Sequence, residues 1–243
     1  NDRHEHGRTE RAMQAAGFSA RQGVWKQTAL VEFNGSFDEY FATKTTKFRN
    51  NIRRYEKRVA KLGEVKFQRH RPAGAAHGDG QPNWDMYNAC EDVAARSWQA
   101  DADDGTTISS PTVRDFFRDT YALATKNGMA DLCLLSVDDR PIAFGYNYVH
   151  DGYVSGMRFG YDKEFAKAGV GNVMYVSMFR DSIERGDSIF DMGVGSLQIK
   201  GPWRTDLVNT YRYTHYPLAS PRSQVLRLKH WWDRRQMEKQ LAT

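Results

Sequence analysis

The sequence is poor in features that mark secreted and membrane-spanning proteins. It has two cysteines in 243 residues, Cys90 and Cys133, and they lie far apart in a helix-like and a strand-like segment. Two buried free thiols in a reducing compartment explain this pair better than a disulfide does. No apolar run approaches the roughly 20 residues that span a bilayer, and the polar start (Asn1–Glu10) has no hydrophobic signal core. We therefore expect a cytoplasmic protein.

Several kinds of catalytic centre are also missing from the sequence. The seven histidines are scattered and form no ligand constellation with cysteines. There is no phosphate-binding Walker sequence and no Gly-x-Ser-x-Gly nucleophile turn. We predict no metal and no covalent enzyme intermediate.

The composition is that of a globular protein with a basic surface. The chain is 40% hydrophobic and 27% charged, and its length suits one large domain or one domain with an appended segment. A net charge of +5 and a pI near 9.1 favour anionic partners. Nucleotides, phosphorylated carriers, RNA and membrane surfaces all satisfy that condition.

The first third of the chain reads as a lead-in followed by strand, helix and strand. Residues 1–23 are polar and lack an initiator methionine, so we interpret them as a lead-in and a candidate end of a preceding domain. A strand is predicted over Val24–Phe33. Ser36 and Glu39 form a capping box that opens one long helix, which Gly63 ends. A short strand, Val65–His70, and a glycine-rich loop over residues 71–83 follow.

The rest of the chain predicts helices and then an antiparallel meander. Apolar spacing indicates helices at 83–98 and 111–127. Short turns separate three strands, Leu132–Val137, Ile142–Val149 and Tyr153–Phe159. The remaining predicted elements are a helix at 171–185, strands at Ser188–Val194 and Val208–Tyr216, and a helix at about 221–241. This order predicts a mixed α/β sheet with a parallel switch after the helix at 171–185.

The turn before that helix is the most informative part of the chain. Gly169 and Gly171 lead directly into the amphipathic helix that Gly186 stops. A glycine turn at a helix start leaves N–H groups at the positive end of the helix dipole, which suits a pyrophosphate. Ordinary turn chemistry is the alternative for a local pattern of this kind.

The order of motifs resembles the GNAT superfamily of acyltransferases, and within it the CelD-like branch related to the FemAB peptidyltransferases. The resemblance covers about residues 36–216. Its motifs are the basic helix Lys47–Arg58, Ala95–Trp98, the hairpin turn Arg140–Ala143, Gly160–Asp162 with Ala168–Gly171, Phe190–Gly195, and Lys200–Trp203. Gln99 stands where the branch usually has lysine after the tryptophan.

The resemblance implies a fold and a donor site over residues 24–243. The fold class is α/β, a mixed, mostly antiparallel sheet splayed between its central strands and flanked by helices. The cofactor is acyl-CoA, most simply acetyl-CoA, whose pantetheine arm enters the splay. Met157, Arg158 and Phe159 would contact that arm, and the pyrophosphate would be held by Lys167, Ala168, Gly169, Val170, Gly171 and Asn172. Ala166 or Lys167 replaces the arginine or glutamine that leads this turn in the superfamily.

Acyl transfer to an amine also needs a proton acceptor and a donor for the departing thiolate. Asp191 is the candidate base because it interrupts an apolar strand, and capping or ion pairing is the alternative. Tyr211 and Tyr213 are candidates for protonating the CoA thiolate, and core packing is their alternative role.

Other residues are candidates for substrate or surface binding. Trp98, Lys200 and Trp203 are candidates for binding the acceptor, although a solvated lysine beside a core tryptophan also explains the last two. Arg158 either faces solvent or lines the cleft. The cations of helix 44–61 form either a solvated face or a platform for a lipid carrier, an anionic membrane or tRNA. Trp231 and Trp232 suit a membrane interface or packing against the sheet.

Three functions follow from these patterns. The first is an N-acyltransferase that moves an acyl group from acyl-CoA to an amine, and the resemblance implies an amino sugar or a similar acceptor in envelope or exopolysaccharide synthesis. The second is a FemAB-like transferase that uses aminoacyl-tRNA. The third is a non-catalytic basic domain that binds nucleic acid or membrane, and a peripheral location at the inner membrane face fits the same charge.

Overall fold

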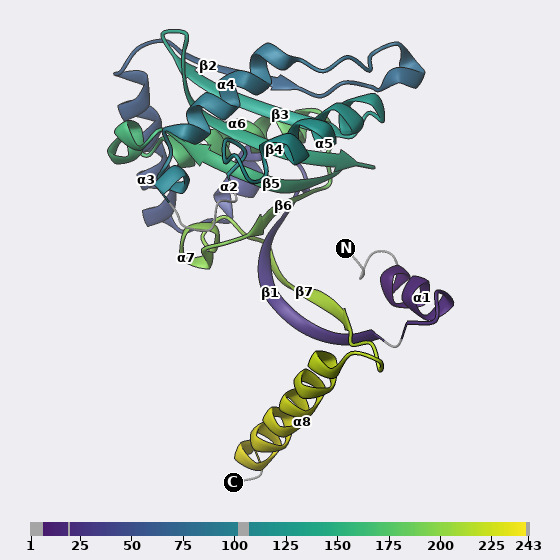
Figure 1. Ribbon diagram of the computed structural model, residues 1–243. Coiled ribbons are helices and arrows are strands. Elements are labelled where there is room, and N and C mark those ends of the chain that lie inside the picture. The colour runs from purple at the N-terminus through teal and green to yellow at the C-terminus, as the bar shows by residue number, and fades with distance from the viewer. Residues whose placement is uncertain (1–6, 19, 102–106, 242–243) are drawn as a thin grey trace. The chain divides into compact units, whose positions relative to one another are not determined.

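The computed structural model describes residues 7–18, 20–101 and 107–241, which fall into two compact units (Figure 1). The larger unit is Thr28–Leu207, and the smaller one combines Asn1–Gln27 with Val208–Thr243. The smaller unit contains α1 (Arg8–Ala15), the first part of β1 (Ala20–Glu32), most of β7 (Asp206–His215) and α8 (Pro221–Leu241). The boundary that we expected after residue 23 therefore lies inside a strand.

A seven-stranded sheet organises the chain in the order β2-β3-β4-β5-β6-β1-β7. Its remaining strands are β2 (Val65–His70), β3 (Ala130–Val137), β4 (Arg140–His150), β5 (Tyr153–Tyr161) and β6 (Ile189–Val194). Strands β2 to β5 pair antiparallel, β6 pairs antiparallel with β1, and β5 and β6 pair parallel. The predicted meander, parallel switch and mixed α/β fold class are confirmed.

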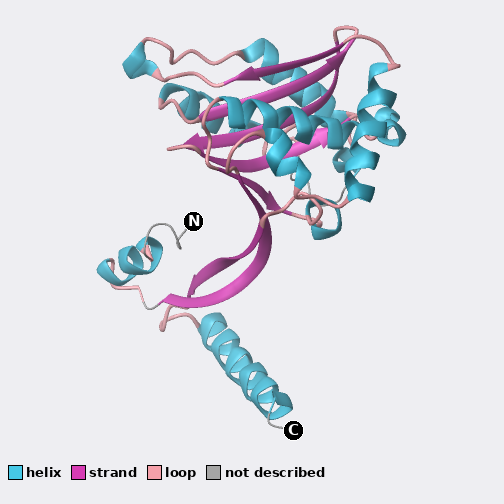
Figure 2. Ribbon diagram, turned by 180° about the vertical axis from the view of Figure 1, so that it is seen from behind, coloured by secondary structure: helices cyan, strands magenta, loops and turns pink. Residues whose placement is uncertain are grey.

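Helices cover both faces of the sheet within the larger unit (Figure 2). On one face lie α4 (Trp84–Ala95) and α5 (Arg114–Lys126), and on the other lie α2 (Phe37–Ala42), α3 (Thr46–Ala60) and α6 (Val170–Glu184). Alternation along β3 supplies both cores: Leu132 and Leu134 pack with α4 and α5, whereas Cys133 and Leu135 pack with α6. Strand β3 is buried along its whole length as a result.

The prediction of one long helix after Ser36 is wrong, because the chain forms two helices there. The capping box is present: the Ser36 hydroxyl accepts the Glu39 N–H at 3.3 Å, and the Glu39 carboxylate accepts the Ser36 N–H at 2.7 Å. Helix α2 ends at Ala42, and the Thr45 hydroxyl accepts the Phe48 N–H at 3.3 Å to begin α3. A second N-cap residue thus interrupts an otherwise continuous apolar period.

The structure also shows the surroundings of the two cysteines and of the two tryptophans on α8. Cys90 and Cys133 are free and fully buried, as predicted. Trp231 and Trp232 on α8 are 48% and 61% exposed, so neither lies in a core. None of the helices in the described parts of the chain combines the length and the apolar character needed to cross a bilayer.

Candidate active site

The candidate site begins where β5 and β6 separate. Their parallel pairing covers only three residue pairs, from Tyr153 with Ile189 to Ser155 with Asp191. Beyond these pairs β5 continues to Tyr161 and β6 to Val194, with no pairing between them. The sheet is therefore splayed, and the unpaired backbone edge of β5 borders the opening.

Two glycines hold the strands close at the apex of the splay. A Cβ atom on Gly156 would lie 2.8 Å from the Asp191 carbonyl oxygen, and one on Gly193 would lie 2.3 Å from the Gly156 carbonyl oxygen. Gly193 also has a φ of +72°, which side chains rarely adopt. The apex therefore requires residues without a Cβ atom.

Strand β5 is bulged just past the apex. Tyr146 pairs with Arg158 but Asn147 pairs with Gly156, so Met157 is the extra residue. The Met157 carbonyl accepts from Arg158 Nη1 at 2.7 Å, and the Phe159 carbonyl accepts from Gln99 Nε2 at 3.1 Å. Side chains satisfy both carbonyls, so this edge of β5 faces the splay rather than β4.

A cavity of about 490 Å³ occupies the splay. Phe159 stacks on Tyr175 of α6 at 4.4 Å, whereas the Arg158 guanidinium lies 4.9 Å from the Phe117 ring of α5. Both Phe159 and Arg158 line the cavity, which is therefore bordered by residues from both faces of the sheet. Its described lining is Trp98, Gln99, Asn147, Gly156, Met157, Arg158, Phe159, Tyr161, Ala166, Gly169, Gly171, Asn172, Tyr175, Met178, Phe190, Met192, Val194, Gly195, Ser196, Ile199 and Lys200.

One end of the cavity is formed by the start of α6. The Gly169 N–H donates to the Ala166 carbonyl at 3.0 Å, and the Asn172 N–H donates to the Gly169 carbonyl at 3.0 Å. The N–H groups of Val170 and Gly171 have no acceptor in the described part of the chain. The chain thus satisfies two of the amides that we expected to bind a diphosphate, those of Gly169 and Asn172, and leaves those of Val170 and Gly171 at the positive end of the helix.

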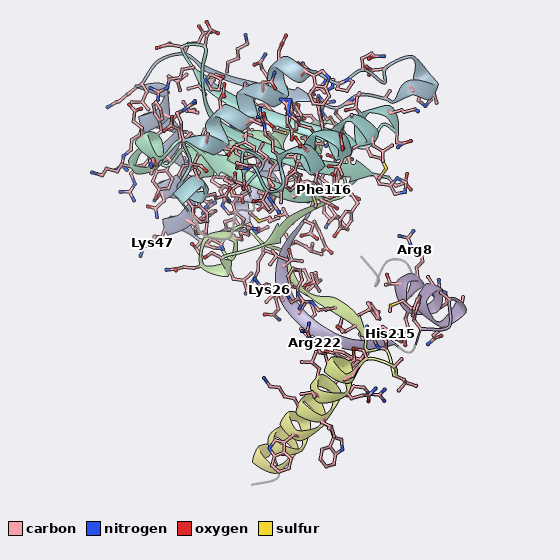
Figure 3. All side chains as sticks on the ribbon, viewed as in Figure 1. Arg8, Lys26, Lys47, Phe116, His215 and Arg222 are labelled. Carbon is pink, nitrogen blue, oxygen red and sulfur yellow. The ribbon has the colours of Figure 1, made fainter. Side chains whose placement is uncertain are left out.

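The basic helix α3 lies beside this turn, and Lys47 marks it in Figure 3. The ring of Tyr55 packs so closely on Gly169 that a Cβ atom there would lie 2.3 Å from it. Arg58 Nη1 donates to the Lys167 carbonyl at 3.5 Å. The only acidic residue of α3, Glu56, pairs with Arg180 at 3.2 Å. Of the other α3 cations Arg49 is half-buried, and the rest, Lys47, Arg53, Arg54 and Lys57, are exposed.

Lys200, beside the C-terminal end of β6, also lines the cavity. Its Nζ donates to the carbonyls of Met192 at 2.6 Å, Gly193 at 2.9 Å and Val194 at 3.1 Å. Burial lowers the pKa of Lys200 to about 8, although the charge of Asp191 opposes the shift. Lys200 and Arg158 are the charged residues of the described lining, so the cavity carries positive charge.

The structure places some of the predicted donor-site residues in the cavity wall and others outside it. Met157, Arg158, Phe159, Gly169, Gly171 and Asn172 line the cavity, as do Trp98 and Lys200 from the predicted acceptor site. Val170 is buried in the core, and Lys167 and Ala168 do not line the cavity. Trp203 is fully buried against Phe48 at 4.8 Å, so its position is a packing position rather than a substrate contact.

The predicted catalytic groups do not lie in the described lining. Asp191 accepts from the Thr28 hydroxyl at 2.6 Å, the Gly193 N–H at 2.8 Å and the Tyr153 hydroxyl at 3.1 Å. Its neighbours Phe190 and Met192 line the cavity, so by alternation the carboxylate points to the opposite side. Tyr211 and Tyr213 belong to the smaller unit, where Tyr211 is 41% exposed.

Gln99, Asn147 and Gly156 were not predicted as site residues, because only the tertiary structure brings them together in the cavity wall. Gln99 was identified only as a departure from a motif, and Asn147 was not identified at all. A lone asparagine in the apolar run of β4 was the available signal, because buried polar groups need a partner. Gly156 in a strand pattern similarly indicates a bulge or a close backbone approach.

The fold and the cavity define a domain with a splayed mixed sheet that is open between β5 and β6. A family model described as "Acetyltransferase (GNAT) domain" matches residues 46–201, and the chain belongs to this family. The predicted superfamily is therefore confirmed, and the chain is an acyltransferase domain in general terms. A comparison with curated proteins gives no significant match.

Solved structures with the same fold include the following three proteins. L-PGS from Bacillus licheniformis is 16% identical with a TM-score of 0.56, over 88% of this chain and 67% of that chain. The C-terminal domain of a putative lysylphosphatidylglycerol synthetase from Agrobacterium fabrum is 15% identical with a TM-score of 0.56, over 87% and 66%. FemX is 12% identical with a TM-score of 0.60, over 89% and 70%. The chain thus spans about two thirds of the length of these proteins, and the likeness concerns the fold.

Proposed function

We propose that the protein is an N-acyltransferase that moves an acyl group from acyl-CoA to an amine. The observation that supports this most strongly is the cavity in the splay, which is lined at one end by Gly171, whose N–H is free, and reaches the bulge of β5. A phosphorylated donor with a long, narrow arm matches such a cavity.

The dimensions of the site suit the pantetheine arm. Tyr161 lies against Gly171 at the anion-binding end, where a Cβ on the glycine would be 2.9 Å from its ring. Gly156, at the apex, precedes Tyr161 by five residues on β5, a span of roughly 16 Å at the usual rise of a strand. The diphosphate would therefore sit at Val170 and Gly171, and the thioester would reach the apex.

The bulged edge of β5 supports the chemical step. Since the Phe159 carbonyl faces the splay, the Phe159 N–H shares that edge and can polarise a thioester carbonyl. Alignment of the two reactants supplies a further part of the rate enhancement. For Asp191 we propose a positioning role instead of the base, because its three hydrogen bonds fix β1, the apex and β5.

The acceptor is proposed from the motif resemblance and from charge. The CelD-like motifs favour an amino sugar or a similar amine in envelope or exopolysaccharide synthesis. Trp98, Gln99 and Arg158 border the cavity, and Arg158 packs on Phe117 of α5, on the face of the sheet opposite α6. We propose that the acceptor enters there, and that the exposed cations of α3 favour a peripheral location at an anionic membrane.

A second donor, aminoacyl-tRNA, is supported by one observation. The exposed cations of α3 flank the same anion-binding turn, with Arg58 bonded to the Lys167 carbonyl at 3.5 Å. A polyanion following this helix would place its terminal ester near the cavity. The cavity itself does not discriminate between the two donors.

Thermal shift and calorimetric titration distinguish these donors. Acetyl-CoA is expected to raise the melting temperature, because a ligand that binds only the folded state stabilises it by mass action. A response to tRNA alone, falling steeply with salt, would replace acyl-CoA by the second donor. A chain that responds to neither would contradict both proposals.

A charge change at the anion-binding turn tests its role in donor binding. Asn172→Asp places a carboxylate beside the diphosphate and is expected to weaken acetyl-CoA binding about 10-fold, by like-charge repulsion near a helix N-terminus. Asn88→Asp on α4, which is exposed and does not line the cavity, is the matched control. Equal affinities of the two variants would contradict the assignment. Gly171 is less suitable for substitution because any side chain there would displace the Tyr161 ring.

A further inference from the structure

A buried asparagine lines the cavity at the apex of the splay. Asn147 is 2% exposed, pairs with Gly156 across the β5 bulge, and contributes to the cavity wall. Its neighbours in that wall include Met178, Phe190 and Met192, which offer little hydrogen bonding. A polar group in such surroundings is costly unless a partner meets each of its atoms.

One end of the Asn147 carboxamide already has its partner. Nδ2 lies 3.4 Å from Asp131 Oδ2 and 3.9 Å from Cys133 Sγ. Only the NH₂ end can face a carboxylate, because an oxygen there would be repelled. The orientation of the carboxamide is therefore fixed by charge, and Oδ1 lies at its other end, with no hydrogen-bond donor to it in the described part of the chain.

Asp131 is held as an anion by a network that reaches away from the cavity. Arg69 donates to both of its oxygens, at 2.7 and 2.6 Å, and Arg71 donates to Oδ2 at 3.2 Å. Burial alone would raise the pKa of Asp131, but the hydrogen bonds and charges of the two arginines hold it below its usual range. Asp187 pairs with Arg71 at 2.8 Å and Asp181 with Arg69 at 2.8 Å, so the arginines are fixed as well.

This arrangement leaves a fixed hydrogen-bond acceptor at the reacting end of the proposed donor site. We propose that Oδ1 of Asn147 accepts a hydrogen bond from the amine of the acceptor substrate and holds that amine beside the thioester carbonyl. The inference rests on the proposed function, because it uses the position of the thioester at the apex. An amine brings N–H groups and develops positive charge as it attacks, and a neutral amide oxygen binds both. The C–N bond forms as the C–S bond breaks, and the proton that the amine loses passes through water to the departing CoA thiolate.

If Asn147 holds the amine, variants without Oδ1 should lose acetyl-transfer rate to an extent that depends on the nucleophile. Asn147→Leu keeps the size of the side chain and removes the acceptor atom, and Asn147→Ala removes it without introducing bulk. The probe is hydroxylamine, a small amine that needs no recognition elsewhere, with acetyl-CoA as donor and acetohydroxamate as product. Both variants are expected to lower the hydroxylamine-dependent rate about 10- to 100-fold, the effect of one hydrogen bond to a group that gains charge.

Two further readouts separate this role from a structural one. The affinity for acetyl-CoA and the slow transfer of its acetyl group to water are expected to fall less than the hydroxylamine-dependent rate, while every rate of the control Asn88→Leu on α4 stays within about twofold of the wild type. Equal losses with water and hydroxylamine, an unchanged hydroxylamine rate, or no wild-type acceleration with bound acetyl-CoA would each overturn the inference. A wild-type chain that does not bind acetyl-CoA would instead refute the proposed function on which the inference rests.

Discussion

Lys200 keeps its ammonium group among three main-chain carbonyls at the end of β6. The sequence suggested it as a contact for the acceptor, and the structure adds that it ties together the strand end that borders the cavity. A lysine that lines a cavity and also satisfies backbone acceptors affects both the shape and the charge of the site.

The first prediction concerns the pH dependence of stability at Lys200. Its pKa is lowered by burial to about 8 from 10.5, so between these values the unfolded chain holds a proton that the folded chain has lost. Stability contributed through this group must therefore rise with pH in that window. The difference in unfolding free energy between the wild type and Lys200→Met is expected to move in favour of the wild type from pH 8 to 10.5. Urea titrations test this, with exposed Lys66→Met as control, and a flat difference would contradict it.

The second prediction concerns the buried pair Arg69–Asp131. Both side chains are almost inaccessible, at 1% and 0% exposed, so removal of the guanidinium leaves an uncompensated carboxylate. Arg69→Leu is expected to cost about 3–5 kcal/mol of unfolding free energy. Arg185→Gln breaks the exposed i,i+4 pair with Asp181 and is expected to cost less than about 1 kcal/mol. Similar costs for the two variants in denaturant unfolding would show that the buried network is not structural.

At the scale of elements, the apex of the splay depends on close backbone approach between β5 and β6. Gly193 and Gly186 both have positive φ, +72° and +79°, but only Gly193 has a neighbour where a Cβ atom would lie. A substitution at Gly186 therefore measures the free-energy cost of a side chain at positive φ alone, and one at Gly193 adds the cost of a steric contact.

The third prediction compares alanine at these two glycines. Gly186→Ala is expected to cost about 1–2 kcal/mol, the conformational penalty of a left-handed residue. Gly193→Ala adds a contact with the Gly156 carbonyl at 2.3 Å, so it is expected to cost at least about 1 kcal/mol more and to weaken acetyl-CoA binding. Denaturant unfolding and calorimetry measure both effects. Equal costs would mean that the apex tolerates a side chain.

Elements with strong local signals were predictable from the sequence. The meander of β3, β4 and β5 follows from alternation and short turns, and the start of α6 follows from Gly169. The interruption between α2 and α3 was missed because the apolar period continues across it, while the cap at Thr45 decides the boundary. Local periodicity does not register a second capping residue of this kind.

At the scale of the whole molecule, the features that the sequence did not predict depend on contacts between segments far apart in the chain. Pairing of β1 with both β6 and β7 joins segments that lie far apart in the sequence, so no local pattern indicated that the C-terminal elements group with the N-terminus. The glycine turn that begins α6 and lines the cavity was located from its motif, and donor binding there stays a prediction. The side to which the Asp191 carboxylate points, and the presence of the Gln99 and Asn147 carboxamides in the cavity wall, depend on how β4, β5 and β6 pair. No short segment of the sequence encodes that pairing.

The most direct test of the account is a crystal structure of the protein with CoA. We predict that the diphosphate lies within hydrogen-bond distance of the Val170 and Gly171 N–H groups, and that the thiol lies at the apex near Gly156 and Asn147. CoA bound outside the splay, or with its diphosphate away from the start of α6, would contradict the assignment of this cavity as the donor site.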